Sequence, residues 1–142
     1  MKVQLVLHDS KDYWSLVKLR SEILRKPLGL EFSKEELALE NKQLHFGIFE
    51  GEDPLACMSL VLENQGEVKM RQVAVAQAAQ GKALGSLLLK EVEAFIKEKA
   101  YTVIHCHARA SAINFYLKNG YQIRGEEFTE VGLAHYYMWK ML

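Results

Sequence analysis

The chain has 142 residues, of which 49% are apolar and 25% charged, and its 18 basic and 18 acidic side chains give a formal net charge of zero. This length predicts one domain, residues 1–142, with a sizeable core. The charge balance offers no general attraction to nucleic acid or to an anionic membrane. The first apolar run is too short for a signal peptide and no segment approaches a membrane span, so we expect a cytoplasmic location.

The two cysteines, Cys57 and Cys106, are isolated in apolar, strand-like sequence. This setting predicts buried free thiols rather than a disulfide or a catalytic nucleophile. His105 and His107 share a strand face, but no Cys/His cluster has the spacing of a metal site, so no metal is predicted.

The first third of the chain predicts a strand at 3–7, a helix over 11–25 and a short second helix over 33–40. Residues 26–30, KPLGL, break the first helix. Arg20 falls on the apolar face of that helix, where we expect it to reach water or to pair with a carboxylate rather than to bind a ligand.

The next segments predict an antiparallel meander. Strands at 44–50 and 55–63 flank a turn over 51–54, and a second turn at 64–67 leads into a third strand. In this third strand the apolar alternation of Val68 and Met70 resumes one residue out of phase at Val73 and Val75. A slip of this kind predicts a β-bulge, which leaves backbone groups available to a ligand.

A loop of small residues, Gln80 to Ser86, follows this strand and runs into apolar residues at helical spacing, predicting a helix from Gly81 to Lys99. Unpaired N–H groups at a helix start, approached closely through glycines, bind anions such as phosphate. Small residues are equally common where a helix packs close to a strand, and the loop matches neither the GxxxxGK[ST] nor the GxGxxG pattern.

The last third predicts a strand at 102–107 parallel to the bulged strand, a short helix from Ala110 ended by Asn119-Gly120, a further strand, and two strands around Gly132. No internal repeat or low-complexity segment is present.

Two motifs resemble those of the GNAT superfamily of acyl-CoA-dependent N-acyltransferases. Gln80-x-x-Ala83-x-Gly85 resembles its [QR]xxGx[GA] signature with alanine for the first glycine, and the segment 110–121 resembles AxxFYxKxGF with Tyr121 for phenylalanine. Further matches over the whole chain resemble the small bacterial ElaA-like branch. The implied fold is α/β (α+β), a mixed central sheet of six to seven strands with a bulged, splayed strand and flanking helices.

The resemblance implies acetyl-CoA as co-substrate. Backbone groups of the bulged strand would face the thioester and pantetheine, and amides of the following loop would hold the pyrophosphate. Alanine at the first glycine should be tolerated if its backbone angles are helical. The residues expected to bind the cofactor are Val73, Ala74, Val75, Gln80, Gly81, Lys82, Ala83, Leu84, Gly85, Ser86, Arg109 and Phe115.

Acyl transfer needs a neutral amine, stabilisation of the thioester oxygen and a proton for the departing thiolate. Tyr116 occupies the position at which GNAT enzymes place a tyrosine facing the coenzyme A sulfur, so we expect it to be the acid; without the resemblance it would be an aromatic core residue. His135, which Glu130 could orient, and His107 are the candidates for the base. A structural role for these histidines, with base catalysis through ordered water, stays open.

The predicted function is direct transfer of an acetyl group from acetyl-CoA to a small-molecule or protein amine, with the acceptor site near residues 25–32 and a homodimer left open. The alternative is an acyl-CoA-binding sensor with little catalytic activity. A nucleotide-binding module is disfavoured because the lysine and serine or threonine of the phosphate loop are missing.

Overall fold

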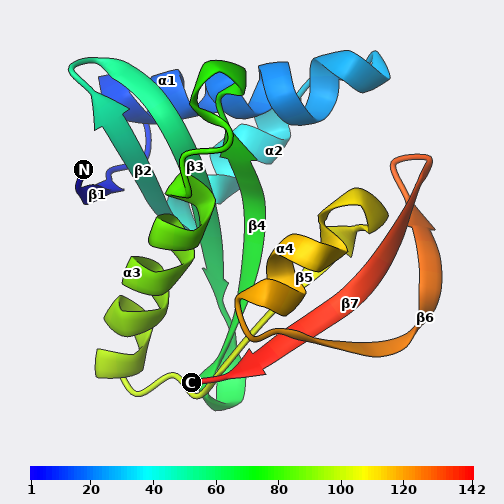
Figure 1. Ribbon diagram of the computed structural model, residues 1–142. Coiled ribbons are helices and arrows are strands. Elements are labelled where there is room, and N and C mark those ends of the chain that lie inside the picture. The colour runs from blue at the N-terminus through cyan, green and yellow to red at the C-terminus, as the bar shows by residue number, and fades with distance from the viewer.

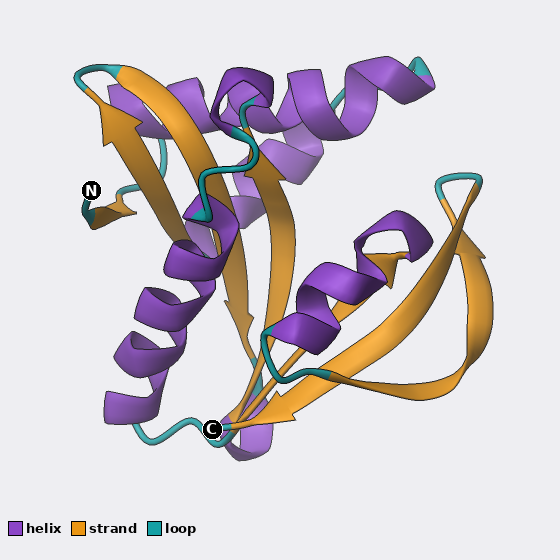
Figure 2. Ribbon diagram, viewed as in Figure 1, coloured by secondary structure: helices purple, strands orange, loops and turns teal.

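The computed structural model describes residues 1–142, whose seven strands form one mixed sheet in the order β1-β2-β3-β4-β5-β7-β6 (Figures 1 and 2). This architecture confirms the predicted α/β fold. The helices are α1 (Lys11–Arg20), α2 (Lys34–Leu39), α3 (Leu84–Glu98) and α4 (Ile113–Lys118). The strands are β1 (Val3–Val6), β2 (Leu44–Glu50), β3 (Asp53–Leu62), β4 (Glu67–Val75), β5 (Val103–Arg109), β6 (Gln122–Glu130) and β7 (Leu133–Met141).

Two hydrophobic clusters lie on opposite faces of the sheet. Cys57 belongs to the cluster under α1, whereas its neighbour Met58 belongs to the larger cluster under α3 and α4. Successive strand residues point to opposite faces, so α1 packs on one side and α3 and α4 on the other (Figure 1). Both cysteines are free and buried, as predicted.

The centre of the sheet divides between β4 and β5. The parallel pairing of these strands covers only Glu67–Met70 against Val103–Cys106, whereas β5 pairs with β7 along its whole length. Beyond Met70 the two strands therefore diverge, as Figure 1 shows. On the other edge of β4 the register with β3 shifts between Cys57 and Ser59, and Gln72 has a φ of 57°. The bulge predicted between Met70 and Val73 is thus confirmed.

The hairpin between β2 and β3 is tighter than predicted. Asp53 and Pro54 were expected in the turn but belong to β3, and only Gly51 and Glu52 connect the strands. The register shifts between Ile48 and Phe49, directly opposite Pro54. A proline, which has no N–H to donate, is tolerated at such an irregularity.

The first helix also differs from its predicted form. The α-helix ends at Arg20, and Ser21–Arg25 forms a π-helical turn before the break at Pro27. The capping box that starts α2 is present, with Ser33 and Glu36 bonded to each other's backbone N–H groups. No helix in the structure combines the length and apolar composition that crossing a bilayer requires.

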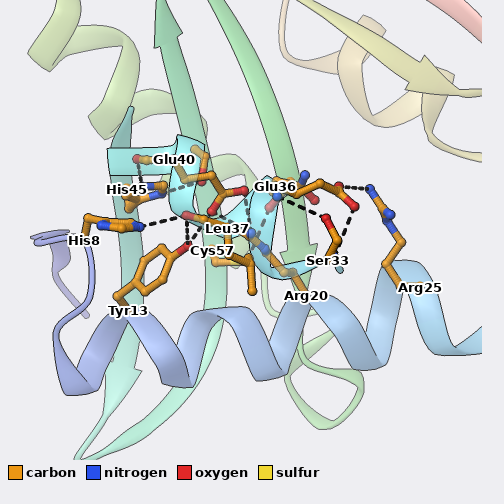
Figure 3. Close-up of polar contacts among 12 residues, drawn as sticks. His8, Tyr13, Arg20, Arg25, Ser33, Glu36, Leu37, Glu40, His45 and Cys57 are labelled. Carbon is orange, nitrogen blue, oxygen red and sulfur yellow. Dashed lines mark hydrogen bonds and ion pairs between the residues drawn. The ribbon is translucent and has the colours of Figure 1, made fainter. Parts of the chain in front are cut away.

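Arg20 lies in a buried polar network between α1, α2 and the sheet (Figure 3). Its Nη2 donates to both carboxylate oxygens of Glu40, at 2.7 and 2.6 Å, and the hydroxyl of Tyr13 donates to the same carboxylate at 2.7 Å. Arg20 is 2% exposed and Glu40 3%. The expected pairing with a carboxylate is therefore confirmed, whereas the alternative of reaching water is wrong.

His45 extends this network in its neutral form. The backbone carbonyl of Glu40, 2.9 Å from Nε2, can only accept, so Nε2 carries the proton and Nδ1 accepts from the Ser59 hydroxyl at 2.7 Å. Burial is the main cause that lowers the pKa of His45 below its usual 6.5.

This lowered pKa predicts a loss of stability in mild acid. The unfolded chain protonates His45 below about pH 6.5, whereas the folded protein resists protonation, so the stabilisation is complete above that pH and is lost as the pH falls. We expect the free energy of unfolding of the parent to fall by at most about 1.4 kcal/mol per pH unit from this group. Denaturant titrations over about two pH units, from roughly pH 7.5 to 5.5, should show that the free energy of unfolding falls less steeply for His45→Gln than for the parent. If the free energy of unfolding falls equally steeply with pH in both proteins, the assignment of this pH dependence to His45 is wrong.

Candidate active site

A cavity of about 1000 Å³ lies where β4 and β5 diverge. Its walls come from the second half of β4, the end of β5, the loop before α3, and residues of α4, the π-helical turn and the β6–β7 hairpin. The wall residues among those predicted for the site are Val73, Ala74, Val75, Gln80, Gly81, Ala83, Leu84, Gly85, Ser86, His107, Arg109, Phe115, Tyr116 and His135.

The end of β4 offers backbone donors to this cavity. The N–H of Ala76 bonds to Leu55 on β3 at 2.8 Å, and successive backbone groups of a strand face alternate edges. The N–H of Val75 therefore faces the other edge, from which β5 has diverged. The N–H of Ala74 lies instead on the β3 side, where it bonds to Cys57.

The loop before α3 is stabilised by its own side chain and differs from the predicted helical start. Gln80 Nε2 donates to the carbonyl of Val75 at 3.2 Å, Gly81 has a φ of 83°, and Lys82 is exposed and outside the cavity wall. The helix begins at Leu84, not at Gly81, because Gly81 and Ala83 both have left-handed backbone angles.

The first turn of α3 has no side-chain cap. Its ladder starts with Leu87 N–H bonded to Ala83, so the N–H groups of the first turn have no acceptor within the helix. A Cβ added at Gly85 would lie 3.0 Å from the ring of Phe115, so glycine allows this close approach of α3 to α4. Ser86 accepts a hydrogen bond from Asn119 at 3.2 Å.

Ala83 has φ 59° and ψ 22°, so the condition under which alanine was expected to be tolerated, helical backbone angles, is not met. This left-handed conformation costs an L-residue roughly 1–2 kcal/mol, offset in part by the 0.5–1 kcal/mol of chain entropy that a glycine loses on folding. We expect Ala83→Gly to raise the free energy of unfolding by roughly 0.5–1 kcal/mol in denaturant titrations. Ala94→Gly, at an exposed site within α3, should lower it by about 1 kcal/mol. If Ala83→Gly also lowers the free energy of unfolding, the left-handed backbone of Ala83 is not strained.

Tyr116 reaches the cavity from α4 and is 6% exposed. Edge-on contacts with Phe115 and Tyr121, at centroid distances of 5.1 and 5.5 Å, hold its ring. Burial, then the neighbouring Cys106, raise the pKa of Tyr116, so its hydroxyl is protonated at neutral pH. Burial also raises the pKa of Cys106 to about 12, which makes its thiol a poor nucleophile.

Glu130 connects the two predicted histidines. Its Oε1 accepts a hydrogen bond from His107 Nδ1 at 2.9 Å, and its Oε2 lies 3.7 Å from His135 Nε2. Although burial raises the pKa of Glu130, the hydrogen bond and charge of His107, aided by His135 and Lys69, lower it overall. Glu130 is therefore ionised at neutral pH.

Arg109 has a structural contact that the sequence did not suggest. Its Nη2 donates to the carbonyl of Leu24 at 2.8 Å, which connects the end of β5 to the π-helical turn. Leu24 and Arg25 of this turn belong to the cavity wall, as do Glu130 and Val131 of the β6–β7 hairpin.

Several polar wall residues were not predicted for the site, among them Lys69 and Arg71, and Glu130 was predicted only as a partner that could orient His135. Lys69 and Arg71 alternate along β4 with the buried Val68 and Met70, a pattern that signals one polar strand face. The sequence suggested Glu130 as a partner of His135 but not of His107, because the contact with His107 depends on the pairing of β6, β7 and β5.

Comparisons with known proteins agree with this geometry. The family described as acetyltransferase (GNAT) domain matches residues 25–142. The uncharacterized N-acetyltransferase YjcF of Bacillus subtilis (strain 168) is 25% identical over 123 residues, covering 86% of this chain and 87% of YjcF. The crystal structure of Escherichia coli ElaA has a TM-score of 0.81 at 18% identity over 99% of both chains. An aminoglycoside 6'-N-acetyltransferase, crystallised with coenzyme A, has a TM-score of 0.81 at 13% identity, covering 99% of this chain and 97% of that one.

The split sheet with its bulged central strand has the same fold as these solved structures, one of which is an aminoglycoside 6'-N-acetyltransferase. This chain belongs to the GNAT acetyltransferase family, as its sequence motifs predicted.

Proposed function

We propose that residues 1–142, acting as one domain, transfer an acetyl group from acetyl-CoA directly to a primary amine. The observation that carries this proposal is the cavity between β4 and β5, which has unpaired backbone donors at one end and an ionised carboxylate with a histidine at the other. Those two ends suit a thioester cofactor and an amine, respectively.

The cofactor would lie along β4 with its diphosphate at the start of α3. The uncapped amides from Leu84 to Ser86, and Gly81 with its left-handed backbone and no side chain, suit a phosphate. The N–H of Val75 would stabilise the oxygen of the thioester, on which negative charge develops during attack. When bound, acetyl-CoA supplies the activated acyl group.

His135 is the better of the two candidate bases. Its Nδ1 donates to the carbonyl of Leu133 at 2.9 Å, which leaves Nε2 of the neutral ring as an acceptor facing Glu130. His107 uses Nδ1 to bond Glu130 and contributes to orienting that carboxylate.

In the proposed reaction the ammonium of the acceptor first loses a proton to solvent, by way of Glu130 and His135. The amine nitrogen then attacks the thioester carbon, and a C–N bond forms as the C–S bond breaks. His135 accepts the second amine proton and Tyr116 gives its proton to the thiolate. His135 then releases its proton to solvent and the phenolate takes one up, so both side chains return to their starting forms and the products are an amide, free coenzyme A and one released proton.

The burial of Tyr116 affects both partners of the proton transfer. It makes the phenol a weaker acid than an exposed tyrosine, but the same apolar wall disfavours the thiolate charge and raises the thiolate's proton affinity. Direct attack is favoured over an acyl-cysteine because the pKa of Cys57 and that of Cys106 are both raised to about 12 by burial.

The test is release of free thiol from acetyl-CoA in the presence of a panel of primary amines, with the acetylated amine identified by mass spectrometry. Reactions without amine measure background hydrolysis, and calorimetry measures acetyl-CoA binding. Amine-dependent thiol release would support the transferase. Tight binding without turnover over the whole panel would favour the sensor, and absence of binding would contradict both.

A further inference from the structure

The end of the cavity near Glu130 has more positive than negative charge. Glu130 is the only carboxylate of the cavity wall, whereas four cationic wall residues come from β4, β5 and the π-helical turn, Arg25, Lys69, Arg71 and Arg109, and a fifth, Lys118, comes from α4. A neutral or purely cationic acceptor would leave this excess of positive charge uncompensated.

Two of the four cations are already engaged. Arg25 lies over the ring of Phe32 at 4.3 Å and 3.6 Å from Glu36, and Arg109 donates to Leu24. No carboxylate lies within ion-pair distance of Lys69 or Arg71. These two side chains project from the same face of β4, about 7 Å apart along the strand, and are free to bind one anionic group.

The opposite wall has two hydrogen-bond acceptors without a donor between them. Glu130 Oε2 and His135 Nε2 are 3.7 Å apart, too far for a hydrogen bond, and Nδ1 of His135 already carries the ring proton. His135 is 3% exposed and its Nδ1 is bonded to the carbonyl of Leu133, so packing and this hydrogen bond hold the direction of its ring. An ammonium group, with three N–H donors, can satisfy both acceptors at once.

A small molecule can reach both sets of groups. Lys69 lies opposite His105 in the pairing of β4 with β5. His107 lies two residues further along β5 and donates a hydrogen bond to Glu130. The Cα atoms of Lys69 and His107 are therefore about 8 Å apart, because they are separated by one strand spacing across the sheet and by two residues along the strand. The charge of Lys69 also contributes to lowering the pKa of Glu130, which is consistent with this proximity.

Building on the proposed transferase function, we infer that the acceptor is a small zwitterion, a primary amine that also carries a carboxylate or phosphate. Its ammonium lies between Glu130 Oε2 and His135 Nε2, and its anionic group binds Lys69 and Arg71. The site thus selects its substrate by two opposite charges held on different strands.

The test compares acceptors of equal chain length that differ only at the far end: an amino carboxylate, an aminoalkyl phosphonate, an amino alcohol and a diamine. With saturating acetyl-CoA, we expect kcat/KM to be at least about tenfold higher for an anionic acceptor than for the alcohol, and lowest for the diamine. The ratio of kcat/KM for the amino carboxylate to kcat/KM for the aminoalkyl phosphonate identifies the preferred anion.

Lys69→Gln and Arg71→Gln should each raise KM for the anionic acceptor by about tenfold or more, and should raise KM for the amino alcohol and for acetyl-CoA much less. Lys90→Gln, an exposed lysine of α3 outside this cavity wall, is the matched control and should change neither constant. Circular dichroism confirms that each variant is folded.

Equal or better turnover of the alcohol or diamine would overturn this inference while leaving the transferase intact. Calorimetric titration of the four acceptors into protein saturated with coenzyme A gives a readout independent of turnover. Anionic acceptors that bind no more tightly than the alcohol, or equally to Lys69→Gln, would overturn it as well. If the anionic acceptors bind but no amine is acetylated, the proposed function fails and the zwitterion site stands.

Discussion

Tyr116→Phe is expected to lower kcat for acetyl transfer by roughly 10²–10⁴-fold, because the variant lacks the only hydroxyl that the buried wall of α4 presents to the departing thiolate. KM for acetyl-CoA should change little, since the ring and its contacts with Phe115 and Tyr121 are retained. Thiol release under conditions in which chemistry limits the rate measures the effect.

Tyr121→Phe is the matched control. The Tyr121 hydroxyl donates to Glu93 at 2.8 Å, away from the cavity wall, so its loss should alter stability but not kcat. An acetyl thioester whose leaving thiol is more acidic depends less on a general acid. With this substrate Tyr116→Phe should therefore regain much of the rate of the parent. Thiol release as fast as in the parent would show that Tyr116 is not the acid.

Glu40→Gln is expected to lower the free energy of unfolding by about 3–5 kcal/mol, because it leaves the guanidinium of Arg20 buried without its counter-charge. The hydroxyl of Tyr13 would lose its strongest acceptor in the same change. Urea titration followed by tryptophan fluorescence and circular dichroism measures the difference.

The exposed pair Lys11–Glu52 provides the control for this prediction. Its side chains are 78% and 81% exposed, so solvent screens the attraction and Glu52→Gln should unfold almost as the parent does. The double variant Arg20→Met, Glu40→Leu should cost less than the sum of its single changes, since it removes both charges. Additive losses would show that the two residues are not coupled.

The sequence was most informative where a local pattern determines the backbone. The one-residue slip between Met70 and Val73 predicted the bulge, since only an extra residue keeps both apolar pairs on the buried face. The Ser33–Glu36 capping box and the Asn119-Gly120 helix end were likewise readable, because each depends on neighbouring residues alone.

Features that depend on distant partners were not readable. Arg20 showed no sign of which carboxylate it would meet, since Glu40 lies on another helix end brought close by packing. The same holds for Glu130, which reaches His107 only through the pairing of β6, β7 and β5. The left-handed angles of Ala83 were missed because alanine favours right-handed helix, and the surrounding loop overrides that preference.

The π-helical turn at Ser21–Arg25 accommodates one residue more than an α-helical turn would. Each residue advances an α-helix by about 100°, so shortening this turn by one would rotate Leu24 and Arg25 by about that angle, away from the wall that they form. The carbonyl that receives Arg109 would move with them. The shape of the cavity is thus sensitive to insertions and deletions in this segment.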